Sequence, residues 1–556
     1  MLAQKENVSR NSISLAVQRL ESTLLLWERD KQQKQYEYLY VCARNKGEKI
    51  KSLWIKSEEN SQTMLKKHLG SAIKRATSFE VEFMFDPQTR QHALDRRNQW
   101  NSLRGKYSAI VNFGGKITHW SSLEMIAQNL SFNRVALNHL GHSEETEANT
   151  LLVPFILYKT QQFYCGNENG AFSQQPSKLY RGNQVVHDDE INQNNFVITI
   201  KSMTRWLLAQ VNEKGQVNYK YWPSRGEFST SNNAIRQWMA TVCLNRAAKV
   251  FNSENIKNSA GKNLNFNLTT MFVEEGGLGY IWMADSAKLG AAALASLAII
   301  ESPERKRFLR EEGALRNLLA ELSNSDGSFD TFFIPRERKD NQNFYSGEAL
   351  LFLATQFSIT RNPAELARVK SAFKYYRQWH RDNRNPAFIP WHTQAYYIVW
   401  NITKDESLKD FIFEMNDWLV DFQQWQLAAY PDMRGRFYDP NRTHFGPPHA
   451  SSTGVYLEGL IDAYDLAKQV EDEQRADTYH IAILRCIRSI MQLQYKNEKD
   501  CFYIKNTSQV LGGIRTTVYD NTIRIDNVQH ALMAFFKINA RFSKSDYLIK
   551  SYTQER

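Results

Sequence analysis

The spacing of hydrophobic residues changes character about a third of the way along the chain. In the first 150 residues, alternating runs such as SFEVEFMF and the pair SAIVNF and GKITHW predict β-strands, and helical spacing occurs at 12–28 and 62–75. From residue 196 onward the apolar residues recur at helical intervals instead. We therefore predict a mixed α/β domain over 1–150, a polar connector over 151–195 and an all-α domain over 196–556.

The helices predicted in the second domain fall into two alternating kinds. Six of them, beginning near residues 232, 285, 346, 391, 450 and 526, are rich in Ala, Gly and other small residues. The helices between them carry a charged face, as helices on the outside of a domain do. Four related helix–turn–strand units recur at intervals of roughly 80–115 residues, which indicates a degenerate internal repeat. Small inner helices alternating with amphipathic outer ones predict an (α/α)6 toroid.

Residues 196–556 resemble the (α/α)6-toroid superfamily. This superfamily includes six-hairpin glycosidases, N-acylglucosamine 2-epimerase-like enzymes and the helical domain of glucuronyl epimerases. The resemblance rests on the helical-hairpin repeat and on the segments NFYSGEALL, PWHTQA and RIDNVQHALMA, and it covers about two-thirds of the chain. It implies that the loops before the inner helices meet at one mouth and bind a carbohydrate there. Residues 1–150 resemble no family.

Polar and aromatic residues are concentrated where the inner helices are expected to begin. Aromatic faces stack on sugar rings, arginine forks pair with carboxylates, and His or acidic side chains transfer protons. The catalytic candidates are His392, His449, His530, Glu348 and Asp526, and the substrate-binding candidates are Tyr221, Trp222, Arg225, Arg236, Tyr345, Trp391, Arg515 and Arg524. Because a closed ring brings the helix starts together, we expect the catalytic candidates to share one pit with Arg524.

Two sugar chemistries fit these candidates, and the sequence leaves both open. Glycoside hydrolysis needs two carboxylates, whereas epimerisation needs a pair of groups that move protons on opposite faces of a carbon. Zinc-dependent cyclisation is disfavoured because Cys243 lies within a helix and no Cys-Cys-His cluster is evident. We expect no metal and no cofactor, since metal-ligand spacings and phosphate-binding glycine loops are lacking. The alternative is a non-catalytic binding or scaffold protein, or a peptide-modifying toroid, that recognises an acidic polymer or partner protein.

Charge adds an expectation about the first domain. Of the net charge of +11, residues 1–110 carry +8, with 20 Lys and Arg against 12 Asp and Glu. This imbalance favours an acidic partner for the first domain. A nucleic acid is the less favoured partner, because Lys66, Lys67, Lys74 and Arg75 cluster without a recognised nucleic-acid-binding module.

Two further patterns bear on location. The longest apolar run, at 289–300, is too short to span a bilayer, so we expect no membrane role. The first ten residues include charges and no apolar stretch leads to a cleavage site, so we expect a cytoplasmic protein.

Overall fold

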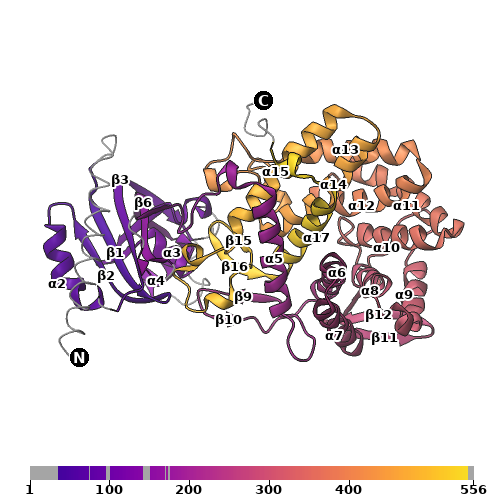
Figure 1. Ribbon diagram of the computed structural model, residues 1–556, viewed down its shortest axis with the longest axis horizontal. Helices are drawn as coiled ribbons and strands as arrows, with labels where there is room; N and C mark the ends of the chain where they lie inside the picture. The colour runs from indigo at the N-terminus through magenta and orange to yellow at the C-terminus, as the bar shows by residue number, and fades with distance from the viewer. Residues whose placement is uncertain are drawn as a thin grey trace.

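The computed structural model of the chain describes residues 35–73, 75–94, 100–141, 151–168, 171–172 and 176–548. The helix expected at 12–28 and the cluster residue Lys74 lie outside these residues. The described chain forms a β-rich first domain joined to a helical second domain (Figure 1).

An antiparallel sheet forms the first domain, with the strand order β2-β1-β3-β6-β4-β5. Its strands are β1 (Tyr38–Asn45), β2 (Glu48–Lys56), β3 (Ser78–Ala93), β4 (Tyr107–Phe113), β5 (Lys116–Trp120) and β6 (Leu152–Glu168), with β7 (Ala171–Phe172) and β8 (Ser177–Leu179) paired to β6. The expected hairpin across Gly114-Gly115 is confirmed, because β4 pairs with β5 through that turn. Helices α2 (Ser61–Ile73) and α4 (Phe132–Leu140) contribute to separate hydrophobic clusters of this sheet.

The segment expected to be a polar connector differs from the expectation. Residues 151–195 contain β6, which lies in the middle of the sheet and pairs with β3 from Leu152 to Gly166. Pro154 argues against a central strand because proline cannot donate to a ladder. Here β4 pairs with β6 only from Phe155 to Lys159, so Pro154 lies just beyond the doubly paired stretch. The true link between the domains is the shorter segment from β8 to the first toroid helix.

Twelve helices of the second domain form two concentric layers. The inner helices are α6 (Ala234–Phe251), α8 (Leu289–Ile300), α10 (Tyr345–Thr360), α12 (Ile389–Thr403), α14 (Ala450–Gln469) and α17 (Ile525–Arg541). Each contacts the next, and α17 returns to contact α6, which closes the ring. The outer helices, each packed on one inner helix, are α5 (Gln193–Ala209), α7 (Glu254–Met271), α9 (Leu309–Glu321), α11 (Pro363–Asp382), α13 (Glu406–Val420) and α15 (Glu473–Leu493). The domain is an (α/α)6 toroid.

Outer helix α7 is absent from the sequence prediction. Its sequence, ENIKNSAGKNLNFNLTTM, is rich in asparagine, which has a weak helix propensity and leaves few apolar positions to mark a face. Two of these asparagines are buried and hydrogen-bonded instead. Asn263 donates to the Gly215 carbonyl at 2.8 Å, and Asn267 donates to the Thr241 hydroxyl at 3.0 Å. A polar contact surface therefore attaches α7 to the ring.

Short strands precede several inner helices. One small sheet has the order β10-β9-β16-β15, and the other has the order β11-β12-β13-β14. These strands are β9 (Lys220–Trp222), β10 (Glu227–Phe228), β11 (Phe272–Glu275), β12 (Leu278–Met283), β13 (Ser286–Lys288), β14 (Phe332–Ile334), β15 (Arg515–Thr517) and β16 (Asp520–Arg524). Strand β13 leads directly into α8 and β16 into α17, so both sheets lie at the end of the ring where inner helices begin.

The first domain packs against this same end of the ring, next to β15 and β16 (Figure 1). Asn129 donates to the Asp520 carboxylate at 2.9 Å, and Asn521 donates to the Ile126 carbonyl at 2.8 Å. Arg181 and Asp432 form a fully buried ion pair at 2.8 Å. The two domains therefore share a polar, partly charged interface. Among the described residues no helix is both long and apolar enough to cross a membrane.

Candidate functional site

Arg236, in the first turn of α6, is the centre of the charged groups at the mouth of the ring. Its Nε atom lies 3.2 Å from Oδ2 of Asp526, at the start of α17, and Arg524 Nε donates to Asp526 Oδ1 at 2.9 Å. Burial alone would raise the pKa of Asp526, but Arg236 and Arg524 outweigh it and hold that pKa at about 2. Asp526 is therefore an ionised carboxylate that anchors two arginines.

Glu348, in the first turn of α10, has the opposite environment. Its side chain is 3% exposed, and its Oε2 atom has no hydrogen-bond partner among the described residues. Burial raises the pKa of Glu348 to about 7, and the positive charge of Arg236 opposes that rise. Gly290 on α8 gives this carboxyl group its space, because a Cβ atom at that position would overlap Glu348 Oε2. Glu348 is therefore a carboxyl group poised to exchange a proton near neutral pH.

Two histidines lie beside these groups on the facing helices. His449 precedes α14 and its Nδ1 lies 2.7 Å from the Ser452 hydroxyl. Burial, followed by the positive charge of Arg524, lowers the pKa of His449 to about 4, so the imidazole is neutral at pH 7. His530 on α17 has its Nδ1 2.7 Å from Oε1 of the buried Glu458. This pairing fixes the orientation of the His530 ring.

Two aromatic candidates flank the charged groups. Tyr345 is half-buried at the start of α10, where burial and then the charge of Glu348 raise the pKa of its phenol. The ring of Trp391, on α12, lies 6.0 Å from the ring of His530. We call the set around Arg236 the mouth cluster; its members are Arg236, Tyr345, Glu348, Trp391, His449, Arg524, Asp526 and His530. Contacts and charge interactions bring these eight candidates to one end of the ring.

The other candidates have different surroundings. His392 is fully buried in α12, where its ring stacks on Phe388 at 3.4 Å and its Nδ1 lies 2.8 Å from the Phe388 carbonyl oxygen. Burial lowers the pKa of His392 to about 3. Its neighbours show a packing role between α10 and α12, because a Cβ atom on Gly347 would come within 2.8 Å of the ring.

Four further candidates lie in the small sheet that includes β9 and β15, or next to it. Arg515 is buried and donates to the Gln492 carbonyl at 2.7 Å, which ties β15 to the end of α15. Tyr221 is buried against Phe228. Arg225 lies over the Trp222 ring at 5.2 Å and lines a cavity of about 380 Å³ together with first-domain residues. In the structure these four side chains therefore pack within the small sheet or line the boundary between the two domains.

Sequence reasoning does not single out Gly290 or the partnership of Glu458 with His530. Gly290 lies in a run of small residues in which nothing distinguishes it from its neighbours. Glu458 and His530 are 72 positions apart, and only the packing of α14 against α17 brings them together. Contacts between helices that are distant in sequence carry no local signal.

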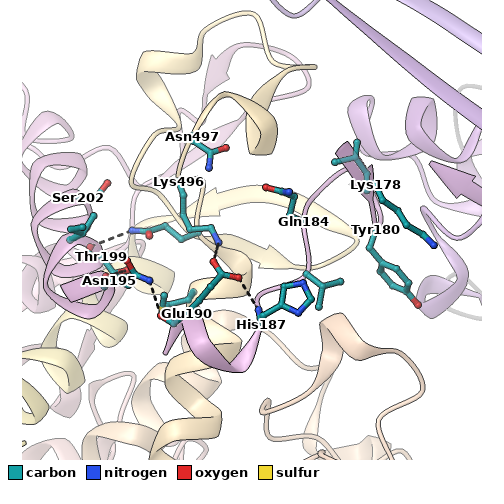
Figure 2. Close-up of a pocket in the computed structure, with 15 residues that line it drawn as sticks. Lys178, Tyr180, Gln184, His187, Glu190, Asn195, Thr199, Ser202, Lys496 and Asn497 are labelled. Carbon is teal, nitrogen blue, oxygen red and sulfur yellow. Dashed lines mark hydrogen bonds and ion pairs between the residues drawn. The ribbon is translucent and has the colours of Figure 1, made fainter. Parts of the chain in front are cut away.

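Two cavities lie outside the centre of the ring. One, of about 20 Å³, is lined by His449, Asp432 and Arg436 and has room for about one water molecule. The other, of about 560 Å³, lies between α5, the segment before it and the loop after α15 (Figure 2). In the larger cavity Lys496 lies 3.8 Å from Glu190. Across the described residues, no group of His, Cys, Asp and Glu could hold a metal ion.

Comparisons with known proteins find similarity in structure alone. No protein-family model matches the sequence, and no curated protein sequence matches it. Similar solved structures are a sugar epimerase from a ruminal bacterium (11% identity, TM-score 0.47, 63% of this chain and 99% of that chain) and a D-mannose isomerase (12%, 0.47, 63% and 99%). A third is an unsaturated glucuronyl hydrolase specific for heparin (13%, 0.44, 63% and 97%).

Proposed function

We propose that the protein is a carbohydrate-active enzyme that binds an acidic sugar at the mouth cluster and acts on it by acid–base chemistry. The observation that carries this proposal is Glu348, a buried carboxyl group whose Oε2 atom has no hydrogen-bond partner among the described residues and whose pKa is raised by burial to about 7. Burying a carboxyl oxygen without a hydrogen-bond partner lowers the stability of the folded protein. A buried group of this kind with a shifted pKa is typical of a functional site.

The charges of the mouth cluster favour an acidic ligand. Arg236 and Arg524 bring two positive charges, and Asp526 compensates only one of them. Both arginine side chains remain accessible, with exposed fractions of 27% and 24%. A guanidinium group binds a carboxylate through two parallel hydrogen bonds, so a uronate-type sugar suits this site better than a neutral one. The half-buried Tyr345 supplies an apolar face for the sugar ring, and the buried Trp391 packs behind His530.

The same residues favour epimerisation over hydrolysis. Arginines that hold a sugar carboxylate make the neighbouring C–H bond more acidic, because they stabilise the negative charge that forms when the proton leaves. The neutral imidazole of His449 accepts that proton, and the Glu348 carboxyl group returns a proton to the other face of the carbon. The Glu458–His530 pair provides a second oriented imidazole at the same end of the ring.

Glycoside hydrolysis is the second candidate, and one observation favours it. Glu348 is partly protonated near neutral pH while Asp526 stays ionised. Glycosidases commonly cleave the glycosidic bond with one protonated and one ionised carboxyl group. Both oxygens of Asp526 are, however, already bound by arginine. A water molecule or sugar would have to displace an arginine to reach this carboxylate, so we place hydrolysis second.

Incubation with oligogalacturonides in D2O separates the two reactions. We expect deuterium to enter the sugar at the carbon that bears the carboxylate, as measured by mass spectrometry, without new reducing ends. His449→Gln should lower this exchange by roughly 10²–10⁴-fold. The matched control is His444→Gln, an exposed histidine in the same loop, which should leave it unchanged. New reducing ends without deuterium would support hydrolysis. If the saccharide neither reacts nor binds, the proposed function is refuted.

A further inference from the structure

Four cationic side chains meet where the first domain, the interdomain segment and a toroid loop come together. They are Arg104 and Lys106 from the first domain, Arg181 from the segment before α5, and Arg436 from the loop after α13. Tyrosines separate and support them. Lys106 Nζ lies 3.7 Å from the centre of the Tyr180 ring, and Arg181 lies 4.5 Å over Tyr430.

The carboxylates near this cationic cluster do not balance it. Asp432 pairs with Arg181, and Asp520 interacts with Arg104. Glu82 is fully buried and hydrogen-bonded to the Ser122 hydroxyl at 2.9 Å, and burial raises its pKa. Two donor groups of the cluster, Arg104 Nε and Arg181 Nη2, are buried without a hydrogen-bond partner among the described residues. The cluster therefore has spare positive charge and spare donors.

Lys106 feels this excess most directly. Burial, followed by the charge of Arg181 and then that of the exposed Lys178, lowers the pKa of Lys106 to about 8. Asp432 and Glu82 act in the opposite direction without cancelling the effect. Like charges held together in this way repel one another, and an anion bound among them would relieve the repulsion.

The cationic cluster lies between the two cavities described above. Lys178 and Tyr180 line the cavity of about 560 Å³, on the side where Figure 2 shows them next to each other. Asp432 and Arg436 line the small cavity that they share with His449 of the mouth cluster. A cavity of about 560 Å³ is within the size range of small-ligand sites. Arg436 and Asp432 thus place the cationic cluster next to His449, and Tyr180, which contacts Lys106, places it next to the larger cavity on the first-domain side.

We propose that Lys106, Lys178 and Tyr180 form the centre of an accessory subsite, built by both domains, for the acidic residues that follow in the same saccharide chain. This proposal rests on the proposed function, because it assigns the next sugars of the ligand bound at the mouth cluster. The lysines hold carboxylate or sulfate groups, and the face of the Tyr180 ring supports the ammonium group of Lys106. Arg436 lines the same small cavity as His449 of the mouth cluster, and this proximity favours a saccharide over a nucleic acid.

The test compares a short and a long acidic saccharide on the full chain. Digalacturonate and tetragalacturonate are titrated calorimetrically into the wild type and into the double variant Lys106→Gln/Lys178→Gln. Lys178→Gln alone changes an exposed side chain and keeps the test valid if Lys106→Gln disturbs folding. Lys51→Gln, an exposed lysine on the edge strand β2, is the matched control for net charge. Maltotetraose and oligo(dT) serve as the neutral and nucleic-acid probes.

We expect the double variant to bind tetragalacturonate about tenfold more weakly while its affinity for digalacturonate stays unchanged. Lys178→Gln should produce part of that loss, and Lys51→Gln none. Equal weakening for both saccharides would overturn the subsite, as would an unchanged affinity for the longer one. Oligo(dT) binding that depends on the two lysines, without tetragalacturonate binding, would assign the cluster to a nucleic acid and overturn it. If the wild type binds neither galacturonate, the proposed function itself has failed.

Discussion

Replacing Glu348 by Gln should lower turnover by roughly 10²–10⁴-fold and at the same time make the protein more stable at alkaline pH. The loss of turnover follows because glutamine has nearly the same shape but cannot exchange a proton. The gain in stability follows from burial, because the ionised carboxylate is removed from water and its Oε2 atom has no hydrogen-bond partner among the described residues. A substitution that lowers activity while it raises stability indicates that the original residue is retained for function.

The direction of the stability effect follows from where the carboxyl group titrates. Unfolded, it loses its proton near pH 4.5, whereas the folded protein holds that proton up to about pH 7. Between these values the folded state binds more protons, so its stability falls as pH rises and stays reduced above pH 7. The difference corresponds to about 3 kcal/mol. Glutamine avoids this cost, so the variant and the wild type should differ little at pH 5 and most at pH 9.

Thermal unfolding at pH 5 and pH 9 measures this effect. The midpoint of Glu348→Gln should exceed that of the wild type by a few degrees at pH 9 and match it at pH 5. Glu311→Gln, at a half-buried position in the first turn of α9, is the control and should show no such dependence. A variant that is less stable than the wild type at both pH values would show that Glu348 is a structural carboxylate.

Asp432→Asn should destabilise the protein by about 3–5 kcal/mol, because it leaves the guanidinium group of Arg181 buried without its counterion. Both side chains are about 1% exposed, and they join the interdomain segment to the toroid. The loss should appear in denaturant unfolding and as faster proteolysis between the domains.

The control for this prediction lies a few residues further along the same loop. Asp439 pairs with Arg442 at 3.0 Å, but the arginine is 44% exposed, so Asp439→Asn should cost less than about 1 kcal/mol. Replacing both buried partners, as in Arg181→Met/Asp432→Leu, should recover much of the stability that Asp432→Asn loses. If Asp432→Asn costs no more than Asp439→Asn, the buried pair does not hold the domains together.

The alternation of small and amphipathic helices was enough to predict the toroid, because that pattern repeats in most of the hairpins. The prediction failed where the buried residues are polar, or where a helix or strand contains residues that are unusual for that kind of element. Helix α7 is attached by buried Asn263 and Asn267, and asparagine resembles a loop residue in the sequence. Strand β6 contains Pro154 and a polar centre, yet it lies between β3 and β4. In both cases tertiary contacts override local propensity.

The sequence indicated which residues lie at the starts of the inner helices. It did not indicate which of these residues contact one another. Residues at the starts of inner helices could be named as candidates because ring closure must bring those starts together, and they stay candidates. His392 belongs to the same class by position, but it lies one residue after Trp391 and therefore faces about 100° away around the helix, where its ring stacks on Phe388. The cationic cluster around Lys106 could not be predicted, since it needs the docking of the first domain onto the loop that carries Asp432 and Arg436.

The most direct test of the account is the titration of Glu348 itself, followed by carbon-13 NMR of its side-chain carboxyl group and assigned with Glu348→Gln. We expect a midpoint near pH 7 in the free protein, because burial disfavours the charged form. Digalacturonate bound at the mouth cluster should raise that midpoint further, since a second negative charge would then lie close to the carboxylate. A midpoint near 4.5 that digalacturonate leaves unchanged would contradict both the acid–base role of Glu348 and the binding of an acidic sugar beside it.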